Sequence, residues 1–220
     1  MVVLWTFRAP ALCRRMHRAF MRNTLLDYTP IIPATAFHQS SYVETYSRYN
    51  SAASTLDTAV ETVRKTIDSI PAIHEALAAA ANEDIAENSI RHICENGFVK
   101  LVSSFQRFAE AQFDLLPHRS QFNPRRNVFQ NLTESSDLWR SAISDGYEDM
   151  LTTSELSHLE CFFQQRHLLA HKEGMVDQAY IDKSGDHRYA VGQRLVIRQD
   201  VVLNLADLVS KLAEELRRRT

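Results

Sequence analysis

Apolar residues recur at alternating steps of four and three along residues 40–70, which is the spacing of one long amphipathic helix. Pro71 is predicted to end this helix, because proline interrupts helical hydrogen bonding. A short helix over 72–81 and a second long helix from the cap Asn82 to about residue 116 follow, and their short connection predicts antiparallel packing. The first apolar series is Tyr42, Tyr46, Tyr49, Ala53, Leu56, Val60, Val63, Ile67 and Ile70.

The remaining sequence predicts further helices and one small hairpin. Residues 117–134 have no periodicity and read as a surface loop, after which Ser135 or Ser136 opens a helix around Trp139. Thr152 and Glu155 form a capping-box pattern before a helix over 154–172. Residues 186–197 predict a β-hairpin that turns at Gly192, and Asp200 is predicted to cap the last helix. We therefore predict an all-α bundle of five to six helices with a small β-hairpin before the C-terminal helix.

Composition excludes several other classes of protein. The 220 residues are 45% hydrophobic and 24% charged, with only five glycines and six prolines, too few for a turn-rich sandwich, barrel or collagen-like repeat. Cys13, Cys94 and Cys161 contain no C-x-x-C pair, which argues against a disulfide framework and a cysteine zinc site. The cysteine pattern favours a reducing cytoplasm, and because no apolar run reaches the ~18 residues of a membrane span we predict no membrane contact.

Charge is distributed unevenly along the chain. Residues 1–26 carry five arginines and no acid, although the formal net charge of the whole chain is −2. We interpret residues 1–38 as a basic N-terminal extension and residues 39–220 as one helical domain. An organellar targeting peptide, an over-long start upstream of Met16 or Met21, and a basic tail are alternative interpretations of the extension.

One cation interrupts the apolar stripe of the predicted helix over 154–172. At about 100° per residue, Arg166 lies about 20° from Leu159, on the face that Phe163 shares. A guanidinium does not enter an apolar core unpaired, so Arg166 is predicted to meet a buried acid, an anionic ligand or another subunit. His167 and His171 flank the same face.

This combination of side chains suits the cleavage of RNA by its own 2′-hydroxyl group. The reaction needs a base, an acid and positive charge beside the phosphorus, and histidine suits the first two because its ordinary pKa is about 6.5. Arginine suits the third, because it stays charged and binds two phosphate oxygens at once. Two chains related by a twofold axis would bring two arginines and two histidines to one cleft.

Residues 161–185, CFFQQRHLLAHKEGMVDQAYIDKSG, resemble the signature segment of HEPN domains, helical proteins that include toxins and defence ribonucleases. The family motif is an arginine followed, after four to six intervening positions, by a histidine. Arg166 and His171 match that motif with four intervening residues. The resemblance implies a homodimer that cleaves RNA without a metal or another cofactor and leaves a 2′,3′-cyclic phosphate and a 5′-hydroxyl.

The resemblance also implies residue roles and partners. Arg166 and His171 would be catalytic, and the supporting residues would be His167, Lys172, Asp177 and Tyr180. The activity would be that of a toxin or phage-defence effector, with RNA as substrate and an antitoxin or regulatory protein as a further partner. Because some HEPN domains serve as scaffolds, a noncatalytic helical module that binds a nucleotide or a partner protein is the alternative.

Each candidate residue also has a structural interpretation. Arg166 pairs with Glu160 or Glu173 in one alternative, and in another His171 bonds a free carbonyl at the end of its helix. His167 and His171 are spaced as two metal ligands on a helix would be, with His187 or Asp177 as a third. The loop arginines either follow an RNA backbone or lie in solvent; they are Arg119, Arg125 and Arg126.

Overall fold

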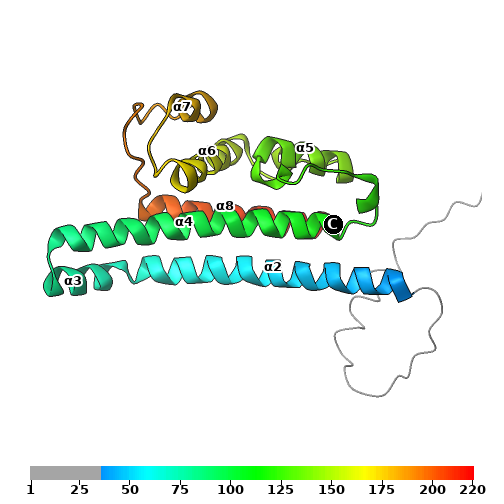
Figure 1. Ribbon diagram of the computed structural model, residues 1–220, viewed down its shortest axis with the longest axis horizontal. Helices are drawn as coiled ribbons and strands as arrows, with labels where there is room; N and C mark the ends of the chain where they lie inside the picture. The colour runs from blue at the N-terminus through cyan, green and yellow to red at the C-terminus, as the bar shows by residue number, and fades with distance from the viewer. Residues whose placement is uncertain (1–35) are drawn as a thin grey trace, which may run out of the picture. The chain divides into compact units, whose positions relative to one another are not determined.

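The computed structural model describes residues 36–220, and their side chains from Tyr42 onward (Figure 1). The chain divides into two units, Met1–Gln39 and Ser40–Thr220, and the second unit is described here by itself. The prediction of an all-α bundle is confirmed, and most of the predicted extension lies outside the described residues. The α-helices of the described part are α2 (Ala36–Asp68), α3 (Ile70–Ala80), α4 (Glu83–Asp114), α5 (Leu132–Ile143), α6 (Thr153–His171), α7 (Gln178–Ser184) and α8 (Gln199–Arg219).

The two long helices of the first half lie antiparallel, as predicted (Figure 1). Pro71 lies in the first turn of α3 and separates this helix from α2, because proline fits the first turn of a helix but cannot continue one. Asn82 then caps α4 by accepting a hydrogen bond from the Ile85 amide at 2.9 Å. These two local signals place the turn that sets α2 against α4.

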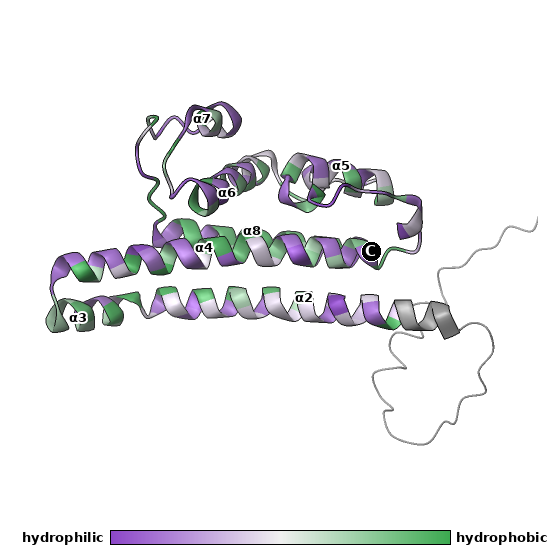
Figure 2. Cartoon of the chain, in the orientation of Figure 1, coloured by the Kyte–Doolittle hydropathy of each residue, from purple (hydrophilic) through white to green (hydrophobic). Residues whose placement is uncertain are grey.

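Helix α8 runs beside α4 and completes a layer of three helices. Gly97 of α4 lies where the three come together, since a Cβ atom added to it would be 3.4 Å from Val63 of α2 and 3.8 Å from Val202 of α8. Ion pairs join the outer edges of α2 and α8, from Arg64 to Asp207 at 2.6 Å and from Arg217 to Asp57 at 3.0 Å. Figure 2 shows hydrophobic and hydrophilic residues alternating along α4.

Helices α5 and α6 pack on this layer through aromatic side chains. Phe162 of α6 lies edge-on to Phe98 of α4, with ring centres 5.6 Å apart. Trp139 of α5 is fully buried and lies 5.2 Å from the ring of Phe113. Because α4 contributes to both contacts, it is the common support of the two helices. No helix in the part of the chain that the structure describes has the length and apolar character needed to cross a membrane.

The predicted start of α5, at Ser135 or Ser136, was three or four residues after the observed start at Leu132. Asn131 caps the helix by accepting a hydrogen bond from the Glu134 amide at 3.1 Å. Ser135 and Ser136 are buried inside the helix, where they hold the short 3-10 turn Tyr147–Asp149. Ser135 bonds the Tyr147 hydroxyl and Ser136 accepts from the Tyr147 amide, each at 2.7 Å. The sequence analysis interpreted Ser135 or Ser136 as the helix cap, because helix caps and tertiary hydrogen bonds both use the short hydroxyl side chain of serine.

The predicted start of α8 was also wrong by a small margin. Arg198 occupies the N-cap position without a capping side-chain bond, and Asp200 lies inside the first turn. An acid there still stabilises the helix, because it faces the positive end of the helix dipole.

The predicted β-hairpin is not formed within residues 36–220. The chain does turn at Gly192, whose φ is +86°, but residues 192–195 bond to the segment after α6. The Val176 amide donates to the Gln193 carbonyl at 2.9 Å, and the Leu195 amide donates to the Gly174 carbonyl at 2.8 Å. The short helix α7 lies directly before the predicted hairpin segment, and the sequence analysis missed it.

Candidate functional site

Helix α6 carries the predicted catalytic pair and is fixed at both ends. The predicted capping box is present: the Thr152 amide donates to Glu155 at 2.8 Å, and the Glu155 amide donates to Thr152 at 3.3 Å. Lys211 of α8 bonds the same carboxylate at 2.7 Å and, together with the Thr152 bonds, lowers the pKa of Glu155 to about 2. The helix ends after His171, where Gly174 adopts a φ of +74° that favours glycine.

Arg166 lines a pocket of about 190 Å³, which we call the Arg166 pocket. The buried Nε atom of its guanidinium has no hydrogen-bond partner among the described residues. Within the same part of the chain Arg166 forms no ion pair, so the alternatives that join it to Glu160 or Glu173 are not realised. Its five N–H donors are therefore oriented by packing rather than by an internal carboxylate.

Two further arginines line the Arg166 pocket. Arg107 comes from α4, and Arg126 comes from the segment between α4 and α5; both are exposed. Three arginines thus face one carboxylate, that of Glu110, among the lining residues. The other residues of the pocket are Ser103, Gln106, Asn127, Phe129 and Gln130. Such a cluster of guanidinium and amide donors is suited to an oxyanion such as phosphate.

His171 is exposed and is not among the residues that line the Arg166 pocket. The five-residue step from Arg166 turns the helix by about 140°, so the two side chains leave α6 in different directions. The His171 ring lies 5.0 Å from that of His167. Burial, followed by the positive charges of His171 and Lys183, lowers the pKa of His167 below its ordinary value. One chain therefore presents the guanidinium and the imidazole pair on separate parts of its surface.

The other predicted supporting residues lie behind or beyond α6. Lys172 is exposed at the C-cap of the helix. Asp177 caps α7 by accepting a hydrogen bond from the Tyr180 amide at 2.9 Å. Tyr180 is 2% exposed and donates its hydroxyl hydrogen to Asp186 at 2.7 Å. Asp177 thus fixes the start of α7, while the Tyr180 hydroxyl also accepts from Gln165 of α6 at 3.3 Å and holds α7 against α6. Both residues lie outside the Arg166 pocket.

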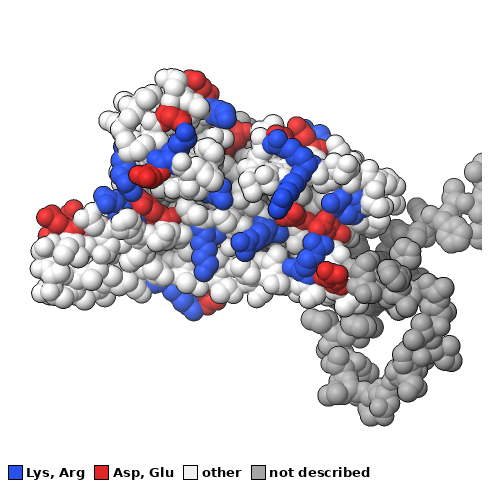
Figure 3. All heavy atoms as spheres, in the orientation of Figure 1, with Lys and Arg blue, Asp and Glu red and all other residues white. Residues whose placement is uncertain are grey.

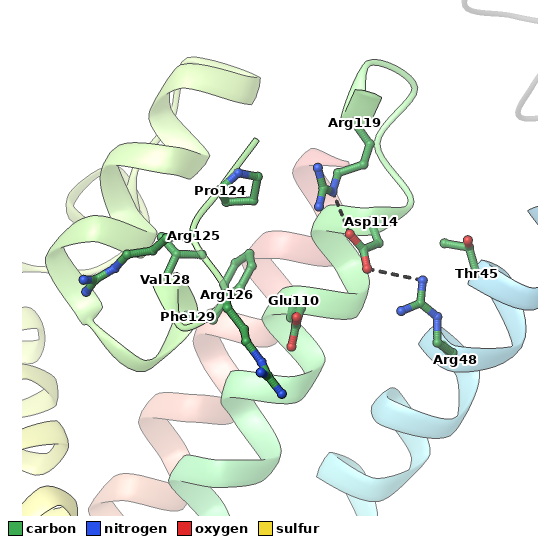
Figure 4. Close-up of a pocket in the computed structure, with 10 residues that line it drawn as sticks. All are labelled: Thr45, Arg48, Glu110, Asp114, Arg119, Pro124, Arg125, Arg126, Val128 and Phe129. Carbon is green, nitrogen blue, oxygen red and sulfur yellow. Dashed lines mark hydrogen bonds and ion pairs between the residues drawn. The ribbon is translucent and has the colours of Figure 1, made fainter. Parts of the chain in front are cut away.

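The predicted loop arginines line a neighbouring pocket of about 490 Å³, which we call the Arg119 pocket (Figure 4). Arg119 and Arg48 both contact Asp114, at 2.6 Å and 3.4 Å. Arg125 instead points away from Asp114 and pairs with Glu134 at 2.7 Å. Arg126 lines both pockets. The tertiary structure thus brings Arg126 and Arg166 to one pocket.

Sequence analysis missed Arg107 and Arg48. Both lie on the polar faces of predicted long helices, where arginine is ordinary and carries no distinctive signal. Arg107 lies on one face of α4 with Ser103, Glu110 and Asp114. The tertiary structure brings the segment after α4, and Arg166 of α6, beside this face. Figure 3 shows Lys and Arg side chains across the face where α4 meets α5 and α6.

The metal-site interpretation of His167 and His171 lacks a third ligand in the described part of the chain. No group of three or more His, Cys, Asp or Glu side chains there is arranged to hold a metal ion. Neither His187 nor Asp177 completes such a group, and Asp177 caps α7 instead.

Comparison with known proteins adds no relationship to this geometry. The chain matches no protein-family model, no curated protein and no solved structure.

Proposed function

We propose that the chain is a metal-independent endoribonuclease of the HEPN type that acts as a homodimer. The observation that carries the proposal is the guanidinium of Arg166, which lines a pocket beside Arg107 and Arg126 and has no carboxylate partner in the described residues. An unpaired, partly buried cation reduces stability, so its presence beside two more cations favours a role in binding an anion.

The proposed reaction divides its work between arginine and histidine. An imidazole accepts the proton of the RNA 2′-hydroxyl, the O2′–P bond forms, and the P–O5′ bond breaks. An imidazolium donates a proton to the leaving O5′ atom, so that a 2′,3′-cyclic phosphate and a 5′-hydroxyl result. Arg166 stabilises the negative charge that develops on the phosphoryl oxygens.

A second copy of the chain is part of this proposal because His171 and the Arg166 pocket face different directions within one chain. In a twofold dimer, His171 of one copy would approach the phosphate that Arg166 of the other copy holds. His171 would be the catalytic histidine, with His167 supporting it. The lowered pKa of His167 favours the neutral form of its ring, which lies 5.0 Å from the ring of His171.

The direct test is cleavage of total RNA and of tRNA by the purified protein in EDTA, with mapping of the product ends. We expect cyclic phosphate and 5′-hydroxyl ends, and a rate at least ~100-fold lower for Arg166→Ala and His171→Ala. Arg198→Gln is the matched control, because Arg198 is exposed and pairs with its neighbour Asp200 at 3.4 Å. Wild-type cleavage by His171→Ala at an unchanged melting temperature would contradict the assignment.

Mixing the two inactive variants tests whether the site is shared between copies. Heterodimers of Arg166→Ala with His171→Ala contain one intact pair made of Arg166 from one copy and His171 from the other. Recovery of cleavage on mixing supports the shared site. Light scattering on the same samples gives the oligomeric state, and an active protein that is strictly monomeric rejects the dimer.

A noncatalytic module that binds a nucleotide or a partner protein is the second candidate function. The position of His171 outside the Arg166 pocket favours it, because a single chain then offers an anion site without an imidazole to act as acid or base. This candidate predicts saturable binding of a nucleotide or a partner protein with no RNA cleavage by the wild-type protein at any concentration.

A further inference from the structure

The Arg166 and Arg119 pockets are neighbours on the surface, and we call the two together the groove. They share three lining residues, Glu110, Arg126 and Phe129, which come from α4 and from the segment that follows it. Arg126 is therefore a cation common to both pockets. A ligand that fills one pocket therefore lies beside residues that also line the other.

The two cations on the far side of the Arg119 pocket are held in place by Asp114. Arg119 donates from Nε to this carboxylate at 2.6 Å and from Nη1 to the Phe122 carbonyl at 2.8 Å. Its guanidinium also lies 5.3 Å from the centre of the Phe113 ring. Arg48 approaches the same carboxylate at 3.4 Å. Since each guanidinium has five N–H donors, both retain donors that point away from Asp114.

The opposite wall of the Arg119 pocket is apolar, formed by Pro124, Val128 and Phe129 (Figure 4). Cations therefore face a wall that offers no hydrogen bond from its side chains. A ligand suited to both walls carries a negative group on one side and a flat, weakly polar ring on the other. A nucleotide unit, with its phosphate and its base, has this composition.

The arginines that line the groove extend over a length greater than one nucleotide. The α4 face from Ser103 to Asp114 spans about 16 Å at the rise of a helix, which is about five nucleotides at the 3.4 Å spacing of a stacked strand. Over this length five arginines line the groove in addition to the outward-facing Arg125, against two carboxylates. They are Arg48, Arg107, Arg119, Arg126 and Arg166.

We propose that the Arg119 pocket is a second phosphate-binding subsite that holds the same strand of single-stranded RNA as the Arg166 pocket, with Arg126 between the two. This inference rests on the proposed binding of RNA at Arg166 but not on cleavage. It assigns Arg48 and Arg119 to substrate binding and leaves the reacting phosphate at Arg166. The site therefore prefers a strand of several nucleotides to a mononucleotide.

The test is fluorescence anisotropy with labelled oligouridines of two, four, six and ten nucleotides. Uniform 2′-O-methylation removes the attacking hydroxyl, so the full chain binds these strands without cleaving them. We expect affinity to increase at least about tenfold from two to six nucleotides, because the longer strand reaches both pockets. Equal affinity for all lengths would overturn the second subsite.

Variants locate the added affinity. Arg119→Gln and Arg48→Gln are each expected to weaken binding of the six-nucleotide strand about fivefold and to leave the two-nucleotide strand much less affected. Each removed phosphate contact also lowers the slope of log affinity against log salt by about 0.7. Arg198→Gln, with its exposed arginine outside the groove, is expected to bind as wild type does. Wild-type affinity and slope in Arg119→Gln and Arg48→Gln would overturn the proposal.

Glu110→Gln tests the same groove without removing an arginine. Glu110 is exposed and lies in both pockets, so its carboxylate repels a phosphate strand. We expect about threefold tighter binding of the six-nucleotide strand after this substitution. Unchanged or weaker binding of RNA by folded Glu110→Gln counts against the subsite. Tighter binding of the anionic polymer polyglutamate than of RNA by the wild-type chain also counts against it.

The outcomes for the two proposals are separable. Length-dependent binding that Arg119→Gln weakens, without cleavage of unmodified RNA, supports the second subsite and rejects the nuclease. Cleavage that needs Arg166, with no effect of Arg119→Gln on either length dependence or salt slope, supports the nuclease and rejects the second subsite.

Discussion

Arg219 at the end of α8 and Arg166 in the groove have opposite environments. Arg219 bonds Asp145, Glu215 at 3.3 Å and the Asp149 carbonyl at 3.0 Å, and so joins α8 to the segment after α5. Arg166 forms no ion pair in the described part of the chain, and its buried Nε atom has no hydrogen-bond partner. The first environment uses the cation to hold the fold together. The second leaves the cation available to a ligand.

The same contrast separates Arg217 from Arg107. Arg217 pairs with Asp57 across the α2–α8 contact and lies 4.8 Å from the centre of the Phe108 ring. Arg107, on the same helix as Phe108, is exposed and forms no ion pair with a carboxylate that the structure describes. Residue type alone does not distinguish the two kinds of arginine, and their partners do.

The largest expected effect is on the stability of the paired region. Arg219→Met should lower the free energy of unfolding by about 2 kcal/mol, because two carboxylates and a carbonyl lose charged hydrogen bonds. Urea denaturation followed by circular dichroism measures it. RNA binding should not change, since Arg219 lies outside both pockets. A loss below about 0.5 kcal/mol would place Arg219 with ordinary surface ion pairs.

Tyr180→Phe should have the next largest effect. Its buried hydroxyl donates to the Asp186 carboxylate, so the substitution should lower the free energy of unfolding by about 1.5 kcal/mol. Tyr189→Phe is the matched control, because the Tyr189 hydroxyl donates to a neutral carbonyl at 3.2 Å. Cleavage by folded Tyr180→Phe at the wild-type rate would show that this residue acts through the fold.

Arg166→Met should move stability in the opposite direction from Arg219→Met. Replacing an unpaired, partly buried guanidinium by an apolar side chain of similar length should raise the free energy of unfolding by about 1 kcal/mol. The same variant should lose RNA cleavage. If Arg166→Met is less stable than wild type, the guanidinium contributes to the fold and the contrast between the two regions disappears.

The smallest expected effect is a pH dependence from His167. Its lowered pKa means that the folded chain binds this proton less readily than the unfolded chain does, so protonation opposes folding. The free energy of unfolding should therefore fall as the pH decreases through 6.5, the ordinary value. His167→Gln should reduce that fall, and paired urea denaturations at pH 7.5 and pH 5 measure the difference. An equal fall in both proteins would show that other groups cause it.

Local sequence signals predicted the helices of the described part well where a cap or a proline marks an end. Asn82 and the Thr152–Glu155 box cap α4 and α6 as predicted. The errors at Ser135 and at the predicted hairpin have one cause. In both places the sequence analysis assumed hydrogen bonds to near neighbours, whereas the groups bond to residues farther away along the chain. Helix α7 was missed because its seven residues are too few to show a period.

The candidate site was predictable in part. Arg166 was conspicuous because a charged residue interrupted an apolar stripe, and the loop arginines were conspicuous because they are clustered in sequence. Arg48 and Arg107 gave no such signal, since an arginine on the polar face of a helix is ordinary. Their part in the groove depends on which segments lie beside them.

The sequence by itself determined the helical class, most helix ends and the anomaly at Arg166, because these follow from periodicity and from bonds between near neighbours. Tertiary structure decided which arginines line a common groove and which of these have no carboxylate partner. That choice depends on contacts between α4, α6 and the segment after α4, whose residues are far apart along the chain. Short-range patterns carry no record of such contacts, because a guanidinium satisfies the same local rules whether its partner is a carboxylate of the fold or a phosphate from outside.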